Sequence, residues 1–574
     1  MSDISQQSIK MWKFGDEEIE VIFRKTTPPE GIEKLVPVLW FPRLQPGESV
    51  DNGIRCERDV PVKMRDGTTI YIDIYRPDGG TDLPAIVAWS PYGKRGGYAP
   101  GGTIIPVGKH GIPPNVTSPM TKFEAPDPAY WCHYGYAVIN VDPRGVGYSE
   151  GDVAFMGTQE GQDAYDLIEW VASRDWCNKR VTMQGNSWLG MIQWFTAAER
   201  PPHLTCIAPW EGCSDMYRDF CVRGGILESG ISDFVAHLIC GSRDQEDIVA
   251  MARKYPLMNG YWEDKIAKVE NIEIPAYVLA GYTNVFHPRG TFDAFKRMPT
   301  PNKWLRVHTN WEWIEQYDPN GLEDLRRFFD RYLKGIRNGW EYTPRVRLSL
   351  YDPGGVNVIN RPEDEWPLAR TQYQKLFLDA ATKTLSTKPV GKESSIHYDA
   401  RDGEVVFTMK FEKDTELAGH AKLYLYVEAT GSNDMDLFVR IGKLDEQGNR
   451  LDHLALGFPE PGFPGFLRVS HRQLDKERST PQQPYHTHRR EQMLKPKEIV
   501  PVEIEIWPIG MIWHAGQQLR IRVSGHDLMP GSNMAHKATG VDVPWFFETR
   551  NKGNHIIHTG GKFDSYLLVP KIPR

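Results

Sequence analysis

The sequence predicts an α/β domain with a helical cap insertion, followed by a C-terminal β-sandwich of the jelly-roll kind. Up to Gly339, short runs that are apolar on both faces alternate with helical patterns, which is typical of parallel strands buried between helices. A mostly helical stretch at residues 211–271 interrupts this alternation. Beyond Gly339, short alternating strands and turns take over. Together, these three observations predict the architecture.

The α/β domain is predicted to open with two antiparallel strands. Residues 60–64 alternate in polarity, Arg65-Asp66-Gly67 forms a tight turn, and residues 68–75 alternate again. The following apolar runs indicate parallel strands at 84–90, 136–142 and 181–184. A helix is predicted to begin at Thr158, which is a candidate N-cap residue with Glu160 in the first turn.

The second half of the α/β domain follows the inserted segment. Helical patterns within that segment lie at 215–220, 234–238 and 248–253. Parallel strands are predicted again at 276–281 and 303–308, followed by a helix over 322–334. Alternating runs at 346–350, 422–427, 502–506 and 518–523 are assigned to the sandwich.

These patterns divide the chain into an arm, a discontinuous α/β domain, a cap and a sandwich. The predicted boundaries are 1–55 for the N-terminal arm, 56–210 and 272–340 for the α/β domain, 211–271 for the cap and 341–574 for the jelly roll. The Gly- and Pro-rich segment 99–126 is too long to serve only as a connector.

Composition excludes several classes of function. The chain of 574 residues is 40% hydrophobic and has a net charge of −7, with no unbroken basic run, so a nucleic-acid partner is not expected. No apolar stretch of transmembrane length and no signal-peptide pattern is seen, which predicts a cytoplasmic chain with no membrane partner. Homo-oligomerisation stays open.

The cysteines and histidines predict neither a disulfide framework nor a metal site. The seven cysteines lie between Cys56 and Cys240 without a Cys-x-x-Cys pair. The histidines of the sandwich show no regular metal-ligand spacing. We therefore expect no cofactor and no metal.

One serine lies in a pattern that is typical of a nucleophile. The strand at 181–184 leads into Gly185-Asn186-Ser187-Trp188-Leu189-Gly190, and a helix-forming apolar run follows. Small residues around a serine between a strand and a helix build a strained elbow that exposes the hydroxyl. The next backbone N–H can then face an oxyanion. The alternative is a buried serine that only caps the helix.

Several long motifs occur in the same order as in a known family. They are Ser90-Pro91-Tyr92-Gly93-Lys94, Asp142-Pro143-Arg144-Gly145, Gly185-Asn186-Ser187-Trp188-Leu189-Gly190, Asp434-Met435-Asp436-Leu437 and His514-Ala515-Gly516-Gln517. With them the chain resembles, from about Cys56 to Pro573, the serine hydrolases that include cocaine esterase, α-amino-acid ester hydrolases and X-Pro dipeptidyl peptidases. The resemblance implies an α/β-hydrolase domain with a helical cap and a jelly roll.

The resemblance also implies roles for individual residues. Ser187 matches the family nucleophile, and Tyr92 matches the tyrosine whose hydroxyl joins a backbone N–H in the oxyanion hole. Trp188 would supply that N–H. A phenol suits this role because it stays protonated at neutral pH, although Tyr92 could also be purely structural.

The sequence departs from the family at the two other triad positions. Asn284 stands where the family has its acid, in Gly281-Tyr282-Thr283-Asn284, and Glu312 stands where the family has its histidine. An amide cannot stabilise an imidazolium by charge, and a carboxylate is a much weaker base than imidazole. The proton relay must therefore be altered.

We predict that the two roles are exchanged between the two loops. His287, three residues after Asn284, would take the proton from Ser187, and Glu312 would orient and stabilise His287. His308, at the end of the preceding strand, is the rival base. The residues expected to contact substrate are Asn284, Phe286 and Trp311, and the aromatic ones favour an apolar substrate.

Two functions compete on this scaffold. The first is a serine hydrolase that cleaves a small-molecule ester or amide through an acyl-enzyme with an altered relay. The second is a non-hydrolytic role in binding or in another acyl or proton transfer. The substitutions at Asn284 and Glu312 favour the second function, whereas the retained elbow favours the first because a pure binding protein has no need of a strained serine.

Overall fold

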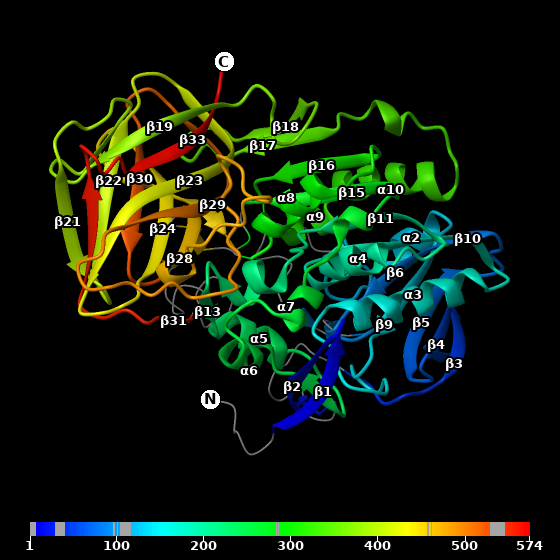
Figure 1. Cartoon of the computed structure of the whole chain (residues 1–574). Helices are drawn as coiled ribbons and strands as arrows, with labels where there is room; N and C mark the ends of the chain where they lie inside the picture. The colour runs from blue at the N-terminus through cyan, green and yellow to red at the C-terminus, as the bar shows by residue number, and fades with distance from the viewer. Residues whose placement is uncertain are drawn as a thin grey trace.

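Two large sheets, joined by helices, form the body of the protein (Figure 1). The computed structural model describes residues 7–28, 41–95, 98–99, 102–103, 116–282, 284, 286–310, 312–455, 458–460, 462–528 and 546–573. In Figure 1 the α/β domain lies on the right, the C-terminal strands lie on the left, and the helices α5 (Gly230–His237) and α6 (Ile248–Lys254) lie below and between them.

An eleven-stranded sheet forms the core of the α/β domain, in the order β18-β17-β16-β15-β11-β10-β6-β9-β5-β4-β3. The strands from β17 to β9 in this order are parallel, and the strands at the two ends are antiparallel. The bounds are β3 Gly47–Asp51, β4 Ile54–Lys63, β5 Thr69–Pro77, β6 Leu83–Trp89, β9 Ala137–Asp142, β10 Cys177–Asn186, β11 Leu204–Trp210, β15 Ala276–Gly281, β16 Lys303–His308, β17 Val346–Leu350 and β18 Val358–Glu363.

Helices cover both faces of this sheet, as the apolar runs predict. Ile86 of β6 packs in one cluster with Trp131 and Phe328, whereas its neighbour Val87 packs in another with Leu167. Because helices lie on both sides, the parallel strands are buried on both faces. The helices of the domain are α2 Pro128–His133, α3 Thr158–Ala172, α4 Trp188–Ala198, α8 Pro288–Arg297, α9 Glu312–Tyr317 and α10 Pro319–Leu333.

The opening antiparallel pair is confirmed, and the predicted cap of one helix is corrected. Strands β4 and β5 pair in antiparallel register, with Val62 opposite Ile70. The N-cap of α3 is Gly157, at φ 101°, and Thr158 is already helical. A threonine next to a glycine looks like a cap in the sequence, but a backbone at this φ favours glycine.

One strand lies in a different sheet from the one that the sequence indicates. Residues 346–350 are predicted to belong to the sandwich, but β17 pairs in parallel with β16 and antiparallel with β18. The predicted boundary at residue 340 therefore cuts through the large sheet. The reason is that the polar residues Arg347 and Ser349 alternate with apolar residues in β17, which is the sequence pattern of an antiparallel strand, although the strand is mostly buried.

The segment between β11 and β15 is mainly helical, as predicted, and also contains short strands. Its elements are η3 Met216–Cys221, β12 Val222–Arg223, β13 Ile226–Glu228, α5, β14 Asp244–Glu246, α6, α7 Gly260–Asp264 and η4 Val269–Asn271. Strand β14 pairs with β2 (Glu17–Lys25) of the N-terminal arm, which pairs in turn with β1 (Ser8–Phe14). Strand β13 pairs with β31 (Phe547–Glu548), so the segment is tied to both ends of the chain.

The C-terminal sheet closes on itself. Its strands follow the order β21-β32-β23-β29-β28-β24-β30-β22-β20-β19-β33, and β33 pairs again with β23. The predicted sandwich is thus closed into a barrel along this edge. The bounds are β19 Gln372–Asp379, β20 Thr384–Ser386, β21 Ser394–Asp399, β22 Glu404–Lys410, β23 Thr415–Thr430, β24 Asp436–Leu444, β28 Phe463–Arg468, β29 Val500–Trp513, β30 Gln518–Ser524, β32 Asn554–Thr559 and β33 Tyr566–Ile572.

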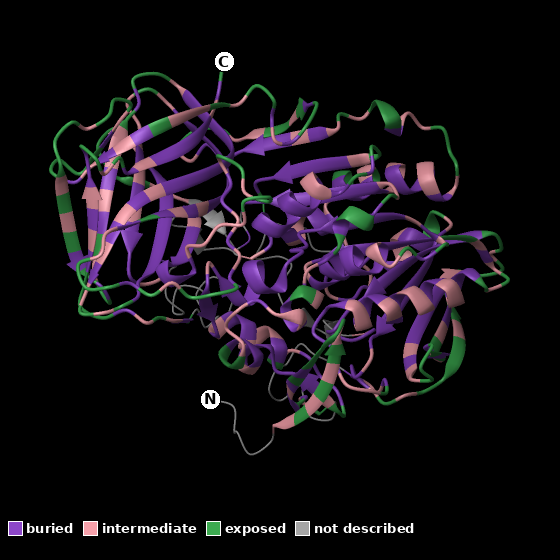
Figure 2. Cartoon of the chain, viewed as in Figure 1, coloured by how far each residue is buried: buried purple, intermediate pink, exposed green. Residues whose placement is uncertain are grey.

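Burial is concentrated in the strands of the two large sheets and in the helices between them (Figure 2). Exposed residues lie mainly on the outer strands and the connecting turns. Within the described ranges, no helix has the length and apolar character needed to cross a membrane.

Close backbone packing joins helix α4 to strand β11. A Cβ atom added at Gly190 would lie 2.5 Å from the carbonyl oxygen of Trp210. Gly212 makes a similar approach from the other side, since its Cβ would lie 2.7 Å from the carbonyl carbon of Gly190. Glycine therefore lets the helix that follows Ser187 sit directly against the sheet.

We expect Gly190→Ala to destabilise the α/β domain. The added methyl group meets backbone atoms, which cannot move aside like a side chain, and overpacking of this kind costs roughly 1–3 kcal/mol. Differential scanning fluorimetry should show a lower melting temperature. Gly391→Ala is the matched control, because a Cβ there meets nothing within 4 Å. Equal melting temperatures for the two variants would contradict the close approach.

Candidate active site

Ser187 lies at a strained turn between β10 and α4. It is the N-cap residue of α4 at φ 55° and ψ −119°, a left-handed backbone that is costly for a serine. The N–H of Ser187 donates to the carbonyl oxygen of Trp210 at 3.1 Å, and the N–H of Asn186 donates to that of Glu124, also at 3.1 Å. A Cβ at Gly185 would lie 2.5 Å from that of Leu189. The turn therefore has the geometry of a nucleophile elbow.

His287 provides the imidazole that contacts the serine. Its Nε2 atom lies 3.1 Å from Ser187 Oγ, within the range in which proton transfer can occur. His287 is fully buried and is the N-cap residue of α8, followed by Pro288 at the first helical position. The edge of the neighbouring Phe286 ring packs against the imidazole at 4.9 Å between centroids.

The other ring nitrogen of His287 has a backbone partner. The N–H of Cys213 donates to Nδ1 at 3.2 Å. Burial and, to a smaller extent, the nearby positive charge of Arg223 lower the pKa of His287 to about 3. The ring is therefore neutral at pH 7 and carries a single proton. Since Nδ1 accepts a hydrogen bond, that proton sits on Nε2 and faces Ser187.

Glu312 contacts Asn284 and not the ring of His287. The Asn284 side-chain amide donates to Glu312 Oε2, and its Oδ1 accepts the N–H groups of Phe286 at 3.0 Å and His287 at 3.2 Å. The predicted direct contact between Glu312 and the imidazole is thus corrected to an indirect one. Cys213 occupies the ring nitrogen that a carboxylate would need.

Asn284 organises the loop before α8. All three of its described hydrogen bonds go to the protein, two to backbone N–H groups and one to Glu312. With these three hydrogen bonds, the amide fixes the backbone turn that carries His287. The prediction that Asn284 contacts substrate stays untested, and Trp311 lies outside the described residues.

Two buried carboxyl groups lie close to the serine. Burial raises the pKa of Glu312 well above its usual range, and the charges of Glu211 and Glu124 raise it further. Burial also raises the pKa of Glu124 to about 8, while the Trp313 indole, which donates to Glu124 Oε1 at 3.1 Å, opposes the increase. Such carboxyl groups hold protons near neutral pH and can exchange them there.

Tyr92 is positioned to donate a hydrogen bond in the site. Burial raises its pKa well above the ordinary value, the charges of Glu124 and Glu312 raise it further, and a hydrogen bond with the Ser187 side chain opposes the shift. The phenol therefore stays protonated. Its ring packs against Phe123 at 5.3 Å between centroids. The N–H of Trp188, in the first turn of α4, has no acceptor within its own helix.

The rival base, His308, is held by another group. Its Nε2 atom contacts Glu211 Oε1, and both side chains are buried at the ends of strands β16 and β11. In the described part of the chain, the imidazole that contacts Ser187 is that of His287.

Several residues of the site carry no recognisable signal in the sequence. Glu124 lies near the end of the long segment 99–126, whose length alone marks it as more than a connector, and residues 100–101 and 104–115 of that segment lie outside the described ranges. Cys213 acts through its backbone N–H, which no sequence pattern reveals. Glu160 stands out only as an acidic residue in the first turn of a helix.

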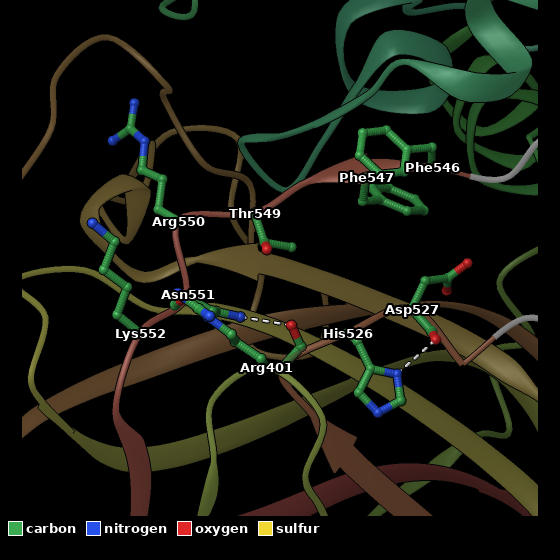
Figure 3. A pocket seen from close by; sticks show the side chains of 10 residues that line it. Arg401, His526, Asp527, Phe546, Phe547, Thr549, Arg550, Asn551 and Lys552 are labelled. Atoms are coloured by element: carbon green, nitrogen blue, oxygen red, sulfur yellow. Dashed lines mark hydrogen bonds between the residues drawn. The ribbon is translucent and has the colours of Figure 1, made fainter.

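A cavity of about 490 Å³ lies elsewhere, on the barrel (Figure 3). Its lining includes the basic side chains of Arg401, Arg550 and Lys552, together with Asp527 and Phe547. None of the predicted catalytic residues lines it. Over the described residues, no group of three His, Cys, Asp or Glu side chains is arranged to hold a metal ion.

The fold and the elbow define the class of the protein as a serine hydrolase with an α/β-hydrolase core. Residues 66–239 match the model of the X-Pro dipeptidyl-peptidase family (S15 family), and residues 338–568 match that of the X-Pro dipeptidyl-peptidase C-terminal non-catalytic domain. Cocaine esterase from Rhodococcus sp. (strain MB1 Bresler) is 24% identical, over 92% of this chain and 100% of its own length.

Solved structures agree with this class. A CocE/NonD family hydrolase from Staphylococcus aureus superposes with a TM-score of 0.85 at 35% identity, over 93% of this chain and 100% of its own. An α-amino acid ester hydrolase shares the fold, with a TM-score of 0.67 at 16% identity over 92% of this chain and 98% of its own. The chain belongs to the CocE/NonD family of hydrolases. The expected resemblance and fold class are therefore confirmed.

We expect His287 to stay neutral across the physiological pH range. Burial lowers its pKa to about 3, so the ring gains a second proton only in strong acid, and the Cys213 N–H keeps the first proton on Nε2. ¹⁵N-imidazole NMR reports both properties, and the spectrum of His287→Ala assigns the signal. A signal that titrates near the ordinary pKa of about 6.5, or one with its proton on Nδ1, would contradict this arrangement.

Proposed function

We propose that the protein hydrolyses a carboxylic ester or amide through an acyl-enzyme formed on Ser187. The carrying observation is the strained elbow, which holds Ser187 Oγ 3.1 Å from His287 Nε2. The names of the relatives support both bond types, since one is a cocaine esterase and others are putative Xaa-Pro dipeptidyl-peptidases. A strained serine is costly, which favours chemistry over a binding role.

In this mechanism Ser187 Oγ attacks the carbonyl carbon of the substrate, and its proton passes to Nε2 of the His287 tautomer that carries its own proton on Nδ1. The negative oxygen of the tetrahedral intermediate accepts hydrogen bonds from the Tyr92 hydroxyl and the Trp188 N–H. The intermediate collapses, the C–O or C–N bond breaks, and His287 returns the proton to the leaving group. Water then attacks the acyl-enzyme by the same route and releases the acid and free Ser187.

The position of the proton on the His287 ring limits how well this residue can act as a base. The imidazole can accept the serine proton only when its own proton is on Nδ1, where the Cys213 N–H must give up its hydrogen bond. A hydrogen bond has a net worth of about 1 kcal/mol, which lowers the share of the basic tautomer roughly fivefold. Among the described residues, Nδ1 is bonded to the Cys213 N–H and not to a carboxylate that could stabilise the imidazolium. Modest turnover of activated esters follows from both effects.

Glu312 acts through the loop in this proposal. It accepts from Asn284, whose Oδ1 holds the backbone of Phe286 and His287, so it positions the imidazole without touching the ring. We further propose that the segment between β11 and β15 serves as a cap, since it supplies the Cys213 N–H to the site. The seven buried free thiols support a reducing compartment such as the cytoplasm.

We expect Ser187→Ala to abolish hydrolysis while the fold stays intact. Loss of the nucleophile lowers kcat roughly 10³-fold or more, as in other serine hydrolases. Turnover of p-nitrophenyl acetate gives the rate. In the unaltered protein, mass spectrometry after fluorophosphonate treatment should find a single adduct, on Ser187. Ser173→Ala, on a surface turn, is the control. Retained activity in Ser187→Ala would rule out the acyl-enzyme.

We expect Tyr92→Phe to lower kcat by about 10²–10³ with a smaller effect on KM, the usual loss for one oxyanion donor. Steady-state kinetics with the same ester provide the measurement. Tyr398→Phe removes the hydroxyl of another buried tyrosine, in strand β21 of the barrel, and should leave kcat unchanged. A normal kcat for Tyr92→Phe would make this tyrosine structural.

A further inference from the structure

A single buried carboxylate reaches both chain segments that carry the oxyanion donors. Glu160, in the first turn of α3, is 5% exposed. Its Oε1 atom accepts the indole N–H of Trp89 at 2.8 Å and that of Trp188 at 3.0 Å. Its Oε2 atom accepts the backbone N–H of Met156 at 2.9 Å. The carboxylate therefore has three N–H donors.

The two indoles belong to the two halves of the site. Trp89 is the last residue of β6 and leads through Ser90 and Pro91 to Tyr92, the side-chain donor. Trp188 directly follows Ser187, and its own backbone N–H is the second donor. One oxygen atom of Glu160 thus joins two segments that lie about a hundred residues apart in the chain and meet at the oxyanion.

The surroundings leave little room for another group to replace this link. A cavity of only about 10 Å³ lies beside Glu160, Pro91 and Trp188, which is at the lower limit for one water molecule. The Trp188 indole packs edge-on against Phe155 at 4.7 Å between centroids. Burial raises the pKa of Glu160 to about 7, while the donors and the charge of Lys265 oppose the increase.

We propose that Glu160 is a positioning residue that sets the spacing between the Tyr92 hydroxyl and the Trp188 N–H. The inference rests on the proposed function, because it needs an oxyanion to form on a substrate bound at Ser187. Two donors stabilise that oxygen fully only when both are held to within about 0.5 Å. Loss of the shared acceptor frees both indoles and lets the two donors move apart.

The first test compares Glu160→Ala and Glu160→Gln with the unaltered protein. We expect Glu160→Ala to lower kcat by roughly 10- to 100-fold with KM changed less than about threefold, because the loss falls on the transition state. Glu160→Gln keeps one carbonyl oxygen as an acceptor and should recover part of kcat. Titration with a fluorophosphonate counts competent sites, so that kcat is expressed per folded site.

A double-mutant cycle tests whether the indoles carry the effect. Trp89→Phe removes one of the two donors to Glu160 Oε1 and should lower kcat by itself. If the two residues act through one link, the losses of Glu160→Ala and Trp89→Phe combine to less than their product. The matched control is Asp163→Asn, one turn further along α3, which removes a buried carboxylate that is bound to Arg144 and should leave kcat per site unchanged.

The outcomes separate this inference from the proposed function. Full activity in Ser187→Ala overturns the acyl-enzyme and the inference with it. If Ser187→Ala is inactive but Glu160→Ala keeps its kcat per titrated site, only the positioning role is overturned. Equal losses in Glu160→Ala and Asp163→Asn also overturn it, because any buried carboxylate of α3 would then have the same effect.

Discussion

The left-handed backbone of Ser187 is the constraint on which the rest of the site depends. It persists because the Trp210 carbonyl, the Glu124 carbonyl and the close approach at Gly190 hold the chain on three sides. Two of these contacts are made with Trp210, at the end of β11, and the third with Glu124, so the turn is held only where the assembled sheet brings these segments together. The backbone strain at Ser187 is unfavourable in free energy, and the packing of the surrounding domain offsets it. A large, rigid sheet therefore supports a small site.

Burial shifts the titratable groups around Ser187 toward their neutral forms. It lowers the pKa of His287 and raises the pKa values of Glu124, Glu312 and Tyr92. In the proposed mechanism, a site with so few fixed charges stabilises the oxyanion mainly through oriented N–H and O–H dipoles. The geometry of these dipoles therefore matters more here than the charge of the relay, and a carboxylate that fixes the two indoles beside the oxyanion acts on the most sensitive quantity.

Much of the fold and part of the site could be predicted from the sequence. Runs that are apolar on both faces identify buried parallel strands, and the glycines around Ser187 identify the elbow. Strand β17 was assigned to the wrong sheet because Arg347 and Ser349 alternate with apolar residues, which is the polarity pattern of an antiparallel strand. The Cys213 and Glu160 contacts could not be found, because a backbone N–H leaves no sequence pattern and a single glutamate in a helix resembles many solvated ones.

The exchange of residue types between the two loops is a small step in this sheet. Strands β15 and β16 are parallel neighbours, with Gly281 beside His308 in register, so the loops that follow them start side by side. Asn284 and Glu312, from these two loops, are in contact. An imidazole a few residues past either strand can therefore approach the same serine, and the triad positions are set by the sheet edge and not by chain order. In the proposed exchange, the described residues bring no carboxylate to Nδ1. That nitrogen lies on the far side of the ring, where the chain after β11 presents the Cys213 N–H. The proposed relay thus depends on which segment of the chain faces each nitrogen of His287.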